Sequence, residues 1–359
     1  MQKKILFTDS LGAGGAQRQL VGLAKLLKEN KYNVKVCTYH NINFYKNLLD
    51  ENNIAIDVVS SENYIQRILT ISKYLKKEKP DWVISYQESP SLIACLAKLL
   101  GGNFKLIVSE RNTTQHIGTN EKVRFFLYRI ADKIVPNSYS QEKFLVEHYP
   151  WMKDKITTIT NFVDLDKFSY HKKKRGAKPL IVVAASVWTP KNTLGFIEAA
   201  KVLSEKKYSF KVEWYGIVKG HDQYLKKCKD LIEKYNLQEY IELLPKTSEI
   251  HEKYKLCDYF CLPSFYEGTP NVICEAISTG RPVICSNVCD NSIYVKENYN
   301  GFLFDPTNPE DIANKLEQAL LLSTKDYYTM CRNSRTLAEE LLSESNFVNK
   351  YIELLDNIK

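Results

Sequence analysis

The chain contains 359 residues, of which 44% are hydrophobic, and carries a formal net charge of +8 at pH 7. This length exceeds the size at which one hydrophobic core keeps growing, so the sequence predicts two domains, each apolar enough to fill its own core. No run of about 18 apolar residues occurs, which excludes a membrane-spanning helix, and there is no low-complexity tract.

The positive charge is concentrated in the N-terminal half of the chain. Residues 1–170 contain 24 Lys+Arg and 17 Asp+Glu, whereas residues 171–359 contain 26 and 25. This asymmetry predicts an acidic partner for the N-terminal half. The nine cysteines form no Cys-x-x-Cys pair and lie mostly in apolar runs, so we expect buried thiols in a reducing cytoplasm and no zinc site. We also expect no signal peptide, because the first residues lead directly into a strand.

The chain opens with a predicted strand, a glycine-rich loop and an amphipathic helix, at residues 5–8, 9–17 and 18–28. The loop contains Gly14 and Gly15, and its amides could cradle a phosphate. A dinucleotide-binding site is the rival interpretation, but Gln17 occupies the position of the third glycine, and the next strand (33–39) ends without an acidic residue. This disfavours a dehydrogenase, while a tight turn without a ligand stays open.

Short strands and helical stretches then alternate through the N-terminal half, which is typical of a parallel sheet wrapped by helices. The strands are predicted at residues 54–59, 82–85, 105–109 and 133–136, with helices at 64–77 and 91–100. The turn after the strand at 105–109 carries Glu110, Arg111, Asn112 and His116. Open α/β folds bind ligands at this carboxyl edge of the sheet.

Residues 121–133 have the pattern of an amphipathic helix. The stripe expected to face the core comprises Val123, Phe126, Leu127 and Ile130. Aromatic and cationic residues would then share the outer face: Phe125, Tyr128, Lys122, Arg124 and Arg129. Such a face is typical of a helix that lies in the headgroup layer of an anionic membrane. The alternative is that Phe125 packs under a neighbouring helix and the cations are solvated.

A charged segment at residues 171–179 is the predicted linker to a second α/β domain. The predicted strands of that domain lie at residues 180–187, 210–215, 241–244 and 259–262, and its helices at 194–204, 224–235, 309–322 and 325–342. A last helix is expected at residues 346–358.

The most informative stretch is residues 260–284, which is predicted as strand, loop, helix and strand. Thr269 is the expected N-cap, with Pro270 at the first helical position. The first helical amides, from Asn271 and Val272, then form an anion site. Glu267 and Glu275 bracket this helix end, and carboxylates offer the paired acceptors that bind vicinal sugar hydroxyls. A sugar nucleotide carries both a diphosphate and such hydroxyls.

The segment from Glu267 to Glu275 resembles the Glu-x7-Glu signature of the retaining glycosyltransferases of family 4, which have the two-domain GT-B fold. The resemblance implies that Glu267 contacts the donor sugar and that Glu275 binds the ribose. It further implies that Lys191 neutralises the donor diphosphate, although Ser186 stands where the family carries a partner arginine. Catalytic residues are thus expected to be Glu267, Lys191 and His116.

The resemblance also implies the remaining ligand contacts. Donor binding is expected from Gly14, Gly15, Lys191, Gly268, Thr269, Pro270, Asn271, Val272 and Glu275, and acceptor binding from Gln17, Arg18, Arg111 and Asn112. Residues 245–248 lie where the family seats the nucleobase. The location of His116 matches a family histidine less closely, so an ordinary surface histidine stays an alternative.

Together these patterns predict an α/β protein of GT-B type, with two Rossmann-like parallel-sheet domains facing across a cleft. The domains are expected at residues 1–170 (acceptor) and 171–342 (nucleotide sugar), with a C-terminal helix (343–359) returning to the first. The expected activity is a retaining, metal-independent hexosyl or N-acetylhexosaminyl transfer from a nucleoside-diphosphate sugar, with UDP the first choice, to a glycan or lipid-linked glycan of the bacterial surface. No cofactor, metal or nucleic acid is expected, and the location is cytoplasmic or peripheral on the membrane. A nucleotide-sugar epimerase and a non-catalytic sugar-nucleotide or glycan binder are the alternatives.

Overall fold

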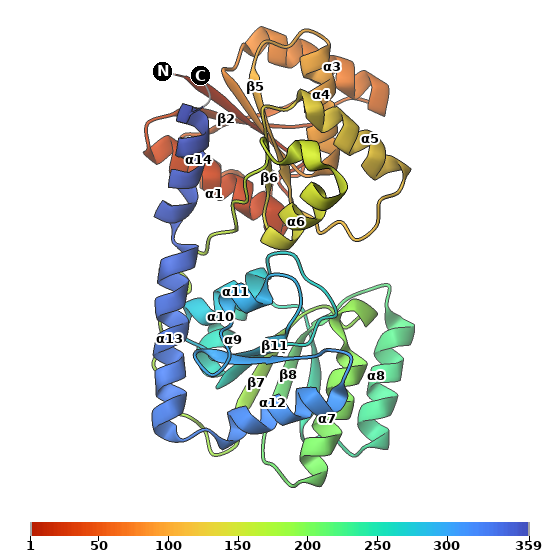
Figure 1. The fold of residues 1–359 in the computed structure, drawn as a ribbon, viewed down its shortest axis with the longest axis vertical. Helices are drawn as coiled ribbons and strands as arrows, with labels where there is room; N and C mark the ends of the chain where they lie inside the picture. The colour runs from red at the N-terminus through yellow and green to blue at the C-terminus, as the bar shows by residue number, and fades with distance from the viewer. Residues whose placement is uncertain (1, 358–359) are drawn as a thin grey trace. The chain divides into compact units, whose positions relative to one another are not determined.

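The computed structural model describes residues 2–357, which divide into two compact units (Figure 1). The first unit contains the residues up to Asn161 together with those from Glu344, and the second contains Phe162–Ser343. The ends of the predicted closing helix and C-terminal segment, Ile358 and Lys359, lie outside the described residues, as does Met1.

The first unit is built on a parallel sheet with the strand order β3-β2-β1-β4-β5-β6. Its strands are β1 (Lys3–Phe7), β2 (Asn33–Thr38), β3 (Ala55–Val58), β4 (Trp82–Tyr86), β5 (Lys105–Glu110) and β6 (Lys133–Pro136). The two central strands β1 and β4 are buried almost throughout, which explains why the sequence shows them as short continuous apolar runs. The order reverses direction between β1 and β4, where open sheets of this type bind ligands.

Helices cover both faces of this sheet (Figure 1). They are α1 (Gly15–Glu29), α2 (Lys46–Glu51), α3 (Tyr64–Glu78), α4 (Glu88–Leu99), α5 (Thr119–Leu127), α6 (Tyr139–His148) and α14 (Glu344–Asn357). The C-terminal helix α14 packs beside α1, and α3 packs against α4. The last helix of the chain therefore completes the first unit.

The second unit repeats the architecture with the strand order β12-β11-β10-β7-β8-β9. Its strands are β7 (Leu180–Ala184), β8 (Lys211–Ile217), β9 (Ile241–Pro245), β10 (Tyr259–Leu262), β11 (Val283–Ser286) and β12 (Gly301–Phe304). Its helices are α7 (Thr193–Glu205), α8 (Asp222–Lys234), α9 (Ile250–Leu256), α10 (Asn271–Ser278), α11 (Asn291–Tyr294), α12 (Pro309–Leu321) and α13 (Thr324–Leu342). The predicted α/β class, with two Rossmann-like parallel sheets, is confirmed.

The boundary between the compact units differs from the sequence prediction. The chain passes into the second unit after Asn161, nine residues before the predicted boundary, because Val163 and Phe168 are buried in the second core. The predicted linker is also fixed to that unit. Lys173 forms an ion pair with Asp258 (2.5 Å), and the Arg175 guanidinium donates to carbonyl oxygens at the end of α12.

The prediction of which α5 side chains are exposed is wrong. Phe125 and Tyr128 are fully buried and Arg124 is nearly so, whereas Val123 is 51% and Phe126 67% exposed. Arg124 can be buried because two carboxylates balance its charge, a compensation that a hydrophobic stripe does not reveal. Lys122 and Arg129 are exposed, as predicted. The aromatic residue beside them on the exposed face is Phe126, not Phe125 or Tyr128.

The cysteines follow the sequence prediction. All nine are free thiols, and eight of them are buried, with Cys289 the exposed one. Burial raises the pKa of the Cys228 and Cys257 thiols to about 12, so these groups stay protonated at neutral pH. No helix within residues 2–357 has the length and apolar character needed to cross a bilayer.

Candidate active site

The loop between β10 and α10 forms the centre of the site in the second unit. The helix begins one residue later than predicted: Pro270, with ψ 88°, occupies the N-cap position, and Thr269 is not the cap. The reason is that the backbone of Pro270 is not helical, so the first helical residue is Asn271. The first backbone N–H groups of a helix have no partner within the helix and point outward from its N-terminal end. They can therefore bind a ligand placed there, and the helix macrodipole favours an anion.

A hollow of about 410 Å³ lies at this helix end. Its walls come from the carboxyl ends of β7, β9 and β10 and from the start of α10, where loops of an open parallel sheet bind ligands. The lining residues are Ala184, Ala185, Ser186, Lys191, Tyr215, Lys246, Thr247, Ile250, Leu262, Glu267, Thr269, Pro270, Asn271 and Val272. Five of the predicted donor-binding positions therefore line one hollow together with Glu267, with Ser186 in its wall, whereas Gly268 and Glu275 are not among the lining residues.

Lys191 and Glu267 form an ion pair across this hollow. The Lys191 Nζ atom lies 2.5 Å from Glu267 Oε1, although the two residues are 76 positions apart. Lys191 ends a short 3₁₀ turn after β7, and the left-handed backbone of Asn192 (φ 54°) then starts α7. Both side chains are part-buried, so their charges interact more strongly than on an open surface.

Glu275 lies one turn into α10 and is only 4% exposed. Its Oε2 atom accepts a hydrogen bond from the Tyr254 hydroxyl of α9 at 3.3 Å. Tyr254 is itself fully buried, so this hydrogen bond fixes the orientation of the Glu275 carboxylate. The sequence did not reveal Tyr254, because α9 lacks a clear amphipathic pattern.

Two further lining residues come from the ends of strands: Lys246, which belongs to the segment 245–248 predicted to seat the nucleobase, and Tyr215, which sequence reasoning did not assign to the site. Lys246, at the end of β9, brings a second cation to the hollow. Tyr215, on β8, lines it as well, and its hydroxyl donates to Glu213 Oε2 at 2.6 Å. Burial raises the pKa of Tyr215, and the hydrogen bond to Glu213 raises it further, so this phenol remains a neutral donor.

In the first unit, the glycine-rich loop leads into α1 and is held by a polar network. Gly14 is the N-cap, and a Cβ there would lie 2.2 Å from Gln17 Oε1, so a larger residue would require the Gln17 side chain to move. The Gln17 side-chain amide donates to Asp9 Oδ1 at 3.2 Å and to Gln87 Oε1 at 3.4 Å. Gln17, which was predicted to contact the acceptor, thus lies where the strand order reverses between β1 and β4. Its neighbours Asp9 and Gln87 were not indicated by the sequence.

A second polar network follows β5. Arg124 Nη1 lies 3.0 Å from Glu88 Oε2, and Arg124 Nε lies 3.4 Å from Glu110 Oε1. Tyr128 donates a hydrogen bond to Glu110. Burial raises the pKa of the Glu110 carboxyl, and the Arg124 and Tyr128 contacts offset this only in part. Asn112 donates to the exposed Glu88 at 3.5 Å, which places a carboxylate and an amide side by side at this edge.

Comparison with known proteins identifies the chain. The family model "Glycosyltransferase Family 4" matches residues 13–167, and the model "Glycosyl transferases group 1" matches residues 166–336. The chain belongs to the group 1 glycosyltransferases of family 4. The chain is thus a glycosyltransferase with two Rossmann-like units, as the Glu-x7-Glu segment had indicated.

Curated relatives of this glycosyltransferase include bacterial sugar transferases. It is 26% identical, over 75% of its own chain and 74% of the relative, to the UDP-Gal:alpha-D-GlcNAc-diphosphoundecaprenol alpha-1,3-galactosyltransferase of Escherichia coli. It is 23% identical, over 100% of its own chain and 99% of the relative, to the GalNAc-alpha-(1->4)-GalNAc-alpha-(1->3)-diNAcBac-PP-undecaprenol alpha-1,4-N-acetyl-D-galactosaminyltransferase of Campylobacter jejuni. The fold matches that of Anabaena Alr3699/HepE, solved in complex with UDP, with a TM-score of 0.87, 17% identity and coverage of 99% and 100% of the two chains.

The other predicted acceptor residues occupy different environments in the glycosyltransferase. Arg111 is 8% exposed, and its guanidinium donates to Asn161 Oδ1 (3.1 Å) and to the Tyr351 hydroxyl (2.7 Å) of α14. It also lies 4.0 Å from the ring centroid of Tyr86. Its role toward an acceptor stays a prediction, but its contacts hold the C-terminal helix to the first unit.

His116 and Arg18 are closer to solvent. His116 is exposed in the loop between β5 and α5, and Arg18 is part-buried in the first turn of α1. The catalytic role of His116 and the acceptor contact of Arg18 stay predictions.

Proposed function

We propose that this glycosyltransferase transfers a hexosyl or N-acetylhexosaminyl group from a UDP-sugar to a lipid-linked glycan, with retention of configuration and without a metal ion. The observation that carries the proposal is the Lys191–Glu267 pair at the N-terminus of α10. A helix N-terminus and a lysine together suit a diphosphate, and the adjacent carboxylate suits sugar hydroxyls. The two groups lie close enough to contact one sugar nucleotide at once.

The chemistry requires a stabilised leaving group. As the bond between sugar and diphosphate breaks, negative charge grows on the diphosphate, and preorganised donors there lower the barrier. The α10 amides, Lys191 and Lys246 are the candidates for these donors. In the structure Lys191 is paired with Glu267, so we expect a bound diphosphate to draw Lys191 away and to leave Glu267 free for the donor sugar.

The nucleoside would occupy the remaining hollow. Glu275 is the proposed ribose contact, held by Tyr254, and the end of β9 with Lys246 and Thr247 is the proposed seat of the base. UDP as the donor nucleotide is supported by the name of the E. coli relative and by the UDP complex of the Anabaena structure.

The acceptor proposal comes from the names of the relatives, two of which act on sugars linked to diphosphoundecaprenol. An acceptor anchored in this way would require the enzyme to approach a membrane. The exposed face of α5 and of the 3₁₀ turn that follows it, formed by Lys122, Val123, Phe126 and Arg129, is the proposed contact with anionic lipid.

The decisive experiment measures UDP release from a panel of UDP-sugars with and without lipid-linked acceptors. A transferase releases UDP only when donor and acceptor are both present, and the anomeric configuration of the product, read by NMR, tests retention. An epimerase would instead convert the donor without releasing UDP, and a binding protein would leave it unchanged. Activity that persists in excess chelator tests metal independence.

Vesicle flotation tests the membrane contact. We expect binding to anionic vesicles that weakens with salt, because each cation near the surface contributes about 1 kcal/mol and is screened by ions. Phe126→Ser should reduce flotation, whereas Leu321→Ser, at an exposed apolar residue of the second unit, is the matched control. Wild-type protein that ignores anionic vesicles at low salt would contradict this contact.

A further inference from the structure

The turn between β4 and α4 holds a glutamine in a backbone conformation that is ordinarily adopted by glycine. Gln87 is the N-cap of α4 and has φ 75° and ψ 168°. The left-handed caps Lys79 and Asn192 have ψ 56° and 40°, so they lie in the more common left-handed helical region. A side chain in the conformation of Gln87 strains the backbone, and such residues gather at functional sites.

The backbone on both sides of Gln87 is fixed. Its amide donates to the Ser109 carbonyl of β5 at 3.2 Å, and its carbonyl accepts from the Ser91 amide of α4 at 3.2 Å. Glycine would make the same two hydrogen bonds without strain. The presence of glutamine at this position therefore indicates that its side chain has a use.

The known contacts of the Gln87 side chain involve only its oxygen. Gln87 Oε1 accepts from the Thr8 hydroxyl at 2.9 Å and from Gln17 Nε2 at 3.4 Å. Thr8 directly follows β1, and Gln17 lies in the first turn of α1. No group within residues 2–357 accepts from Gln87 Nε2, so its N–H groups are available to a ligand.

The Asp9 carboxylate beside it is oriented in a similar way. Asp9 Oδ1 accepts from the Ser10 amide at 2.6 Å and from Gln17 Nε2 at 3.2 Å, and the hydroxyls of Thr8 and Ser10 lie 3.3 Å from the same oxygen. All four contacts use Oδ1. Asp9 Oδ2 is thus an unused acceptor in the part of the chain that the structure describes.

One amide group brings Asp9 and Gln87 together. Both accept from Gln17 Nε2, at the point where the strand order reverses between β1 and β4. Thr8 and Gln17 are buried, whereas Asp9 and Gln87 are part-exposed, so a ligand can reach these two side chains. An unused carboxylate oxygen next to an unused N–H matches a hydroxyl group, which both donates and accepts.

The charge of this pair selects against an anionic ligand. Asp9 forms no ion pair with a residue between 2 and 357, and the next residue after Gln87 is Glu88, whose carboxylate is 43% exposed. A phosphate or a sugar acid would be repelled by the Asp9 carboxylate, whereas a neutral hydroxyl would donate a charge-assisted hydrogen bond to it.

We propose that Asp9 and Gln87 bind one hydroxyl group of a neutral acceptor sugar, which donates to Asp9 Oδ2 and accepts from Gln87 Nε2. This inference rests on the proposed function and extends it, because it assigns this pair to the sugar of the acceptor and not to its diphosphate. The strained backbone of Gln87 is then the means by which its carboxamide is held beside Asp9.

Acceptors that lack single hydroxyls test the pair. The probes are GlcNAc and GalNAc linked through a diphosphate to undecaprenol, with analogues in which one sugar hydroxyl is replaced by hydrogen. Asp9→Asn should raise the KM for the acceptor about 10- to 100-fold, since a hydrogen bond to a charged group is lost. The KM for the UDP-sugar should stay within about twofold, because distant sites are independent.

One analogue should show coupling to Asp9. Removal of the bound hydroxyl should lower the affinity of the wild type by a similar factor and should leave Asp9→Asn unchanged, whereas the losses for the other analogues should multiply. The analogue that lacks the attacking hydroxyl is measured as an inhibitor. If every analogue gives multiplying losses, Asp9 contacts none of these hydroxyls and the proposal is wrong.

Gln87→Gly and Gln87→Ala separate binding from backbone structure. Both remove the carboxamide, but only glycine relieves the strain, so Gln87→Gly should melt at a higher temperature than Gln87→Ala. Both should nevertheless raise the KM for the acceptor equally, by about threefold to tenfold, as expected for a neutral hydrogen bond. If the KM follows stability instead and Gln87→Gly behaves as the wild type, the side chain is structural and the proposal is overturned.

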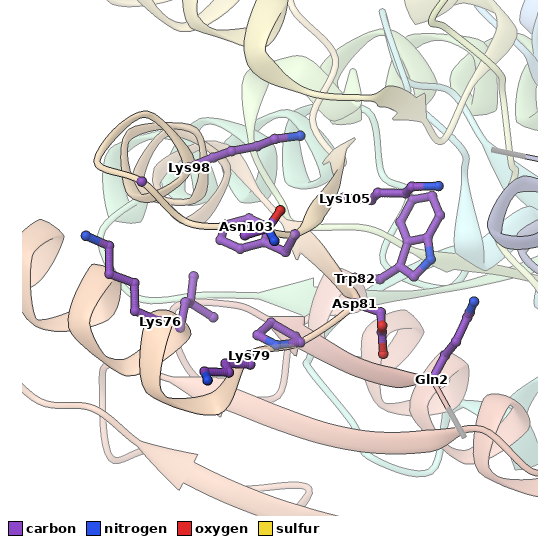
Figure 2. A pocket seen from close by; sticks show the side chains of 12 residues that line it. Gln2, Lys76, Lys79, Asp81, Trp82, Lys98, Asn103 and Lys105 are labelled. Atoms are coloured by element: carbon purple, nitrogen blue, oxygen red, sulfur yellow. The ribbon is translucent and has the colours of Figure 1, made fainter. Parts of the chain in front are cut away.

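Lys79→Gly is the matched control. Lys79 precedes β4 as Gln87 follows it, has φ 46°, and lies exposed at the opposite edge of the sheet near Asp81 and Trp82 (Figure 2). The change should leave the KM for the acceptor within about twofold of the wild type. An equal rise in Lys79→Gly and Gln87→Gly would show a general effect on β4 and would contradict the assignment.

The outcomes distinguish this pair from the proposed function. Wild-type protein that releases no UDP with any donor and acceptor contradicts the proposed function, and this inference fails with it. An active wild type whose acceptor KM is unaltered by Asp9→Asn overturns the Asp9–Gln87 pair alone.

Discussion

At the carboxyl edge of the second sheet, Lys191 and Lys246 line the hollow beside α10, whereas at the carboxyl edge of the first sheet carboxylates and amides hydrogen-bond to one another. The first unit does contain buried cations there, but the Arg111 guanidinium is bound to Asn161 and Tyr351, and the Arg124 guanidinium is paired with Glu88 and Glu110. A cavity at the opposite edge of the sheet is lined by Lys76, Lys79, Lys98 and Lys105 (Figure 2).

This difference shows how one topology can serve two kinds of ligand. Loops after the strands can be changed without altering the strand order, so function depends on the side chains that they carry. Cations beside a helix N-terminus favour a diphosphate, and neutral or acidic acceptors favour the hydroxyls of a glycan. The comparison therefore supports donor binding in the second unit and acceptor binding in the first.

Lys191→Ala should have the largest effect on catalysis. Removing one preorganised donor from a developing charge lowers turnover by about 10²- to 10³-fold. Steady-state kinetics with the identified donor would measure this loss, and the thermal unfolding temperature should change little, because Lys191 is only part-buried. Lys246→Ala, at the exposed second cation, should cost less, and Ser186→Arg should be tolerated. Near-normal turnover of Lys191→Ala would show that the diphosphate is held elsewhere.

Arg111→Met should show the opposite profile. The change leaves the Tyr351 hydroxyl and the Asn161 side chain without their charged partner, which costs about 2–4 kcal/mol of stability. Urea unfolding would reveal the loss, with Tyr351→Phe as a milder variant of the same contact. If Arg111→Met instead keeps its stability and raises the KM for the acceptor, the residue contacts the acceptor as the sequence had predicted.

The two glutamates of the second unit should separate binding from turnover. Glu275→Gln should weaken UDP binding about tenfold, because an amide has one acceptor oxygen where the ribose diol requires two. Glu267→Gln should lower turnover more than UDP affinity, since Glu267 is nearer the proposed sugar position. Calorimetry with UDP on both variants, with Tyr254→Phe as the control for the carboxylate's orientation, would measure the difference. Equal losses of affinity would remove the distinction.

Lys4→Met should have the smallest effect, and its sign depends on pH. Burial lowers the pKa of Lys4 to about 8, Asp81 and Asp356 oppose the shift, and Lys105 adds to it. Below pH 8 the folded state must hold a proton that the unfolded state binds more tightly, so the variant should be more stable than the wild type at pH 7. The advantage should shrink as pH rises from 8 toward 10.5, because the wild type then loses this cost. Thermal melts across that range would test the trend.

Much of the fold could be predicted because its strands are short apolar runs bounded by turn residues. The strands at 133–136 and 259–262 have the predicted limits, and the other strands differ by one to three residues. The helices α2, α6, α9 and α11 were not predicted. For α2, α9 and α11, four to seven residues are too few to show a period, and α6 buries only Gln141 and Leu145, so it presents no apolar stripe. The face of α5 was assigned incorrectly because the balancing partners of Arg124 come from distant segments.

The site divides in the same way. Glu267, Asn271 and Glu275 lie within one continuous segment, so their spacing alone indicated a helix end with two carboxylates. Tyr254, Asp9 and Gln87 reach their partners through the tertiary fold, and no local pattern marks them.

The burial of Tyr351 has a consequence for how the protein is made. Tyr351 is fully buried beside Tyr86, with the two hydroxyls 2.9 Å apart, yet it is synthesised 265 residues later. The first unit therefore cannot be completed until the whole of Phe162–Ser343 has been synthesised. A nascent chain that stops before α14 would carry all of the second unit and a first unit in which Arg111 lacks its Tyr351 contact.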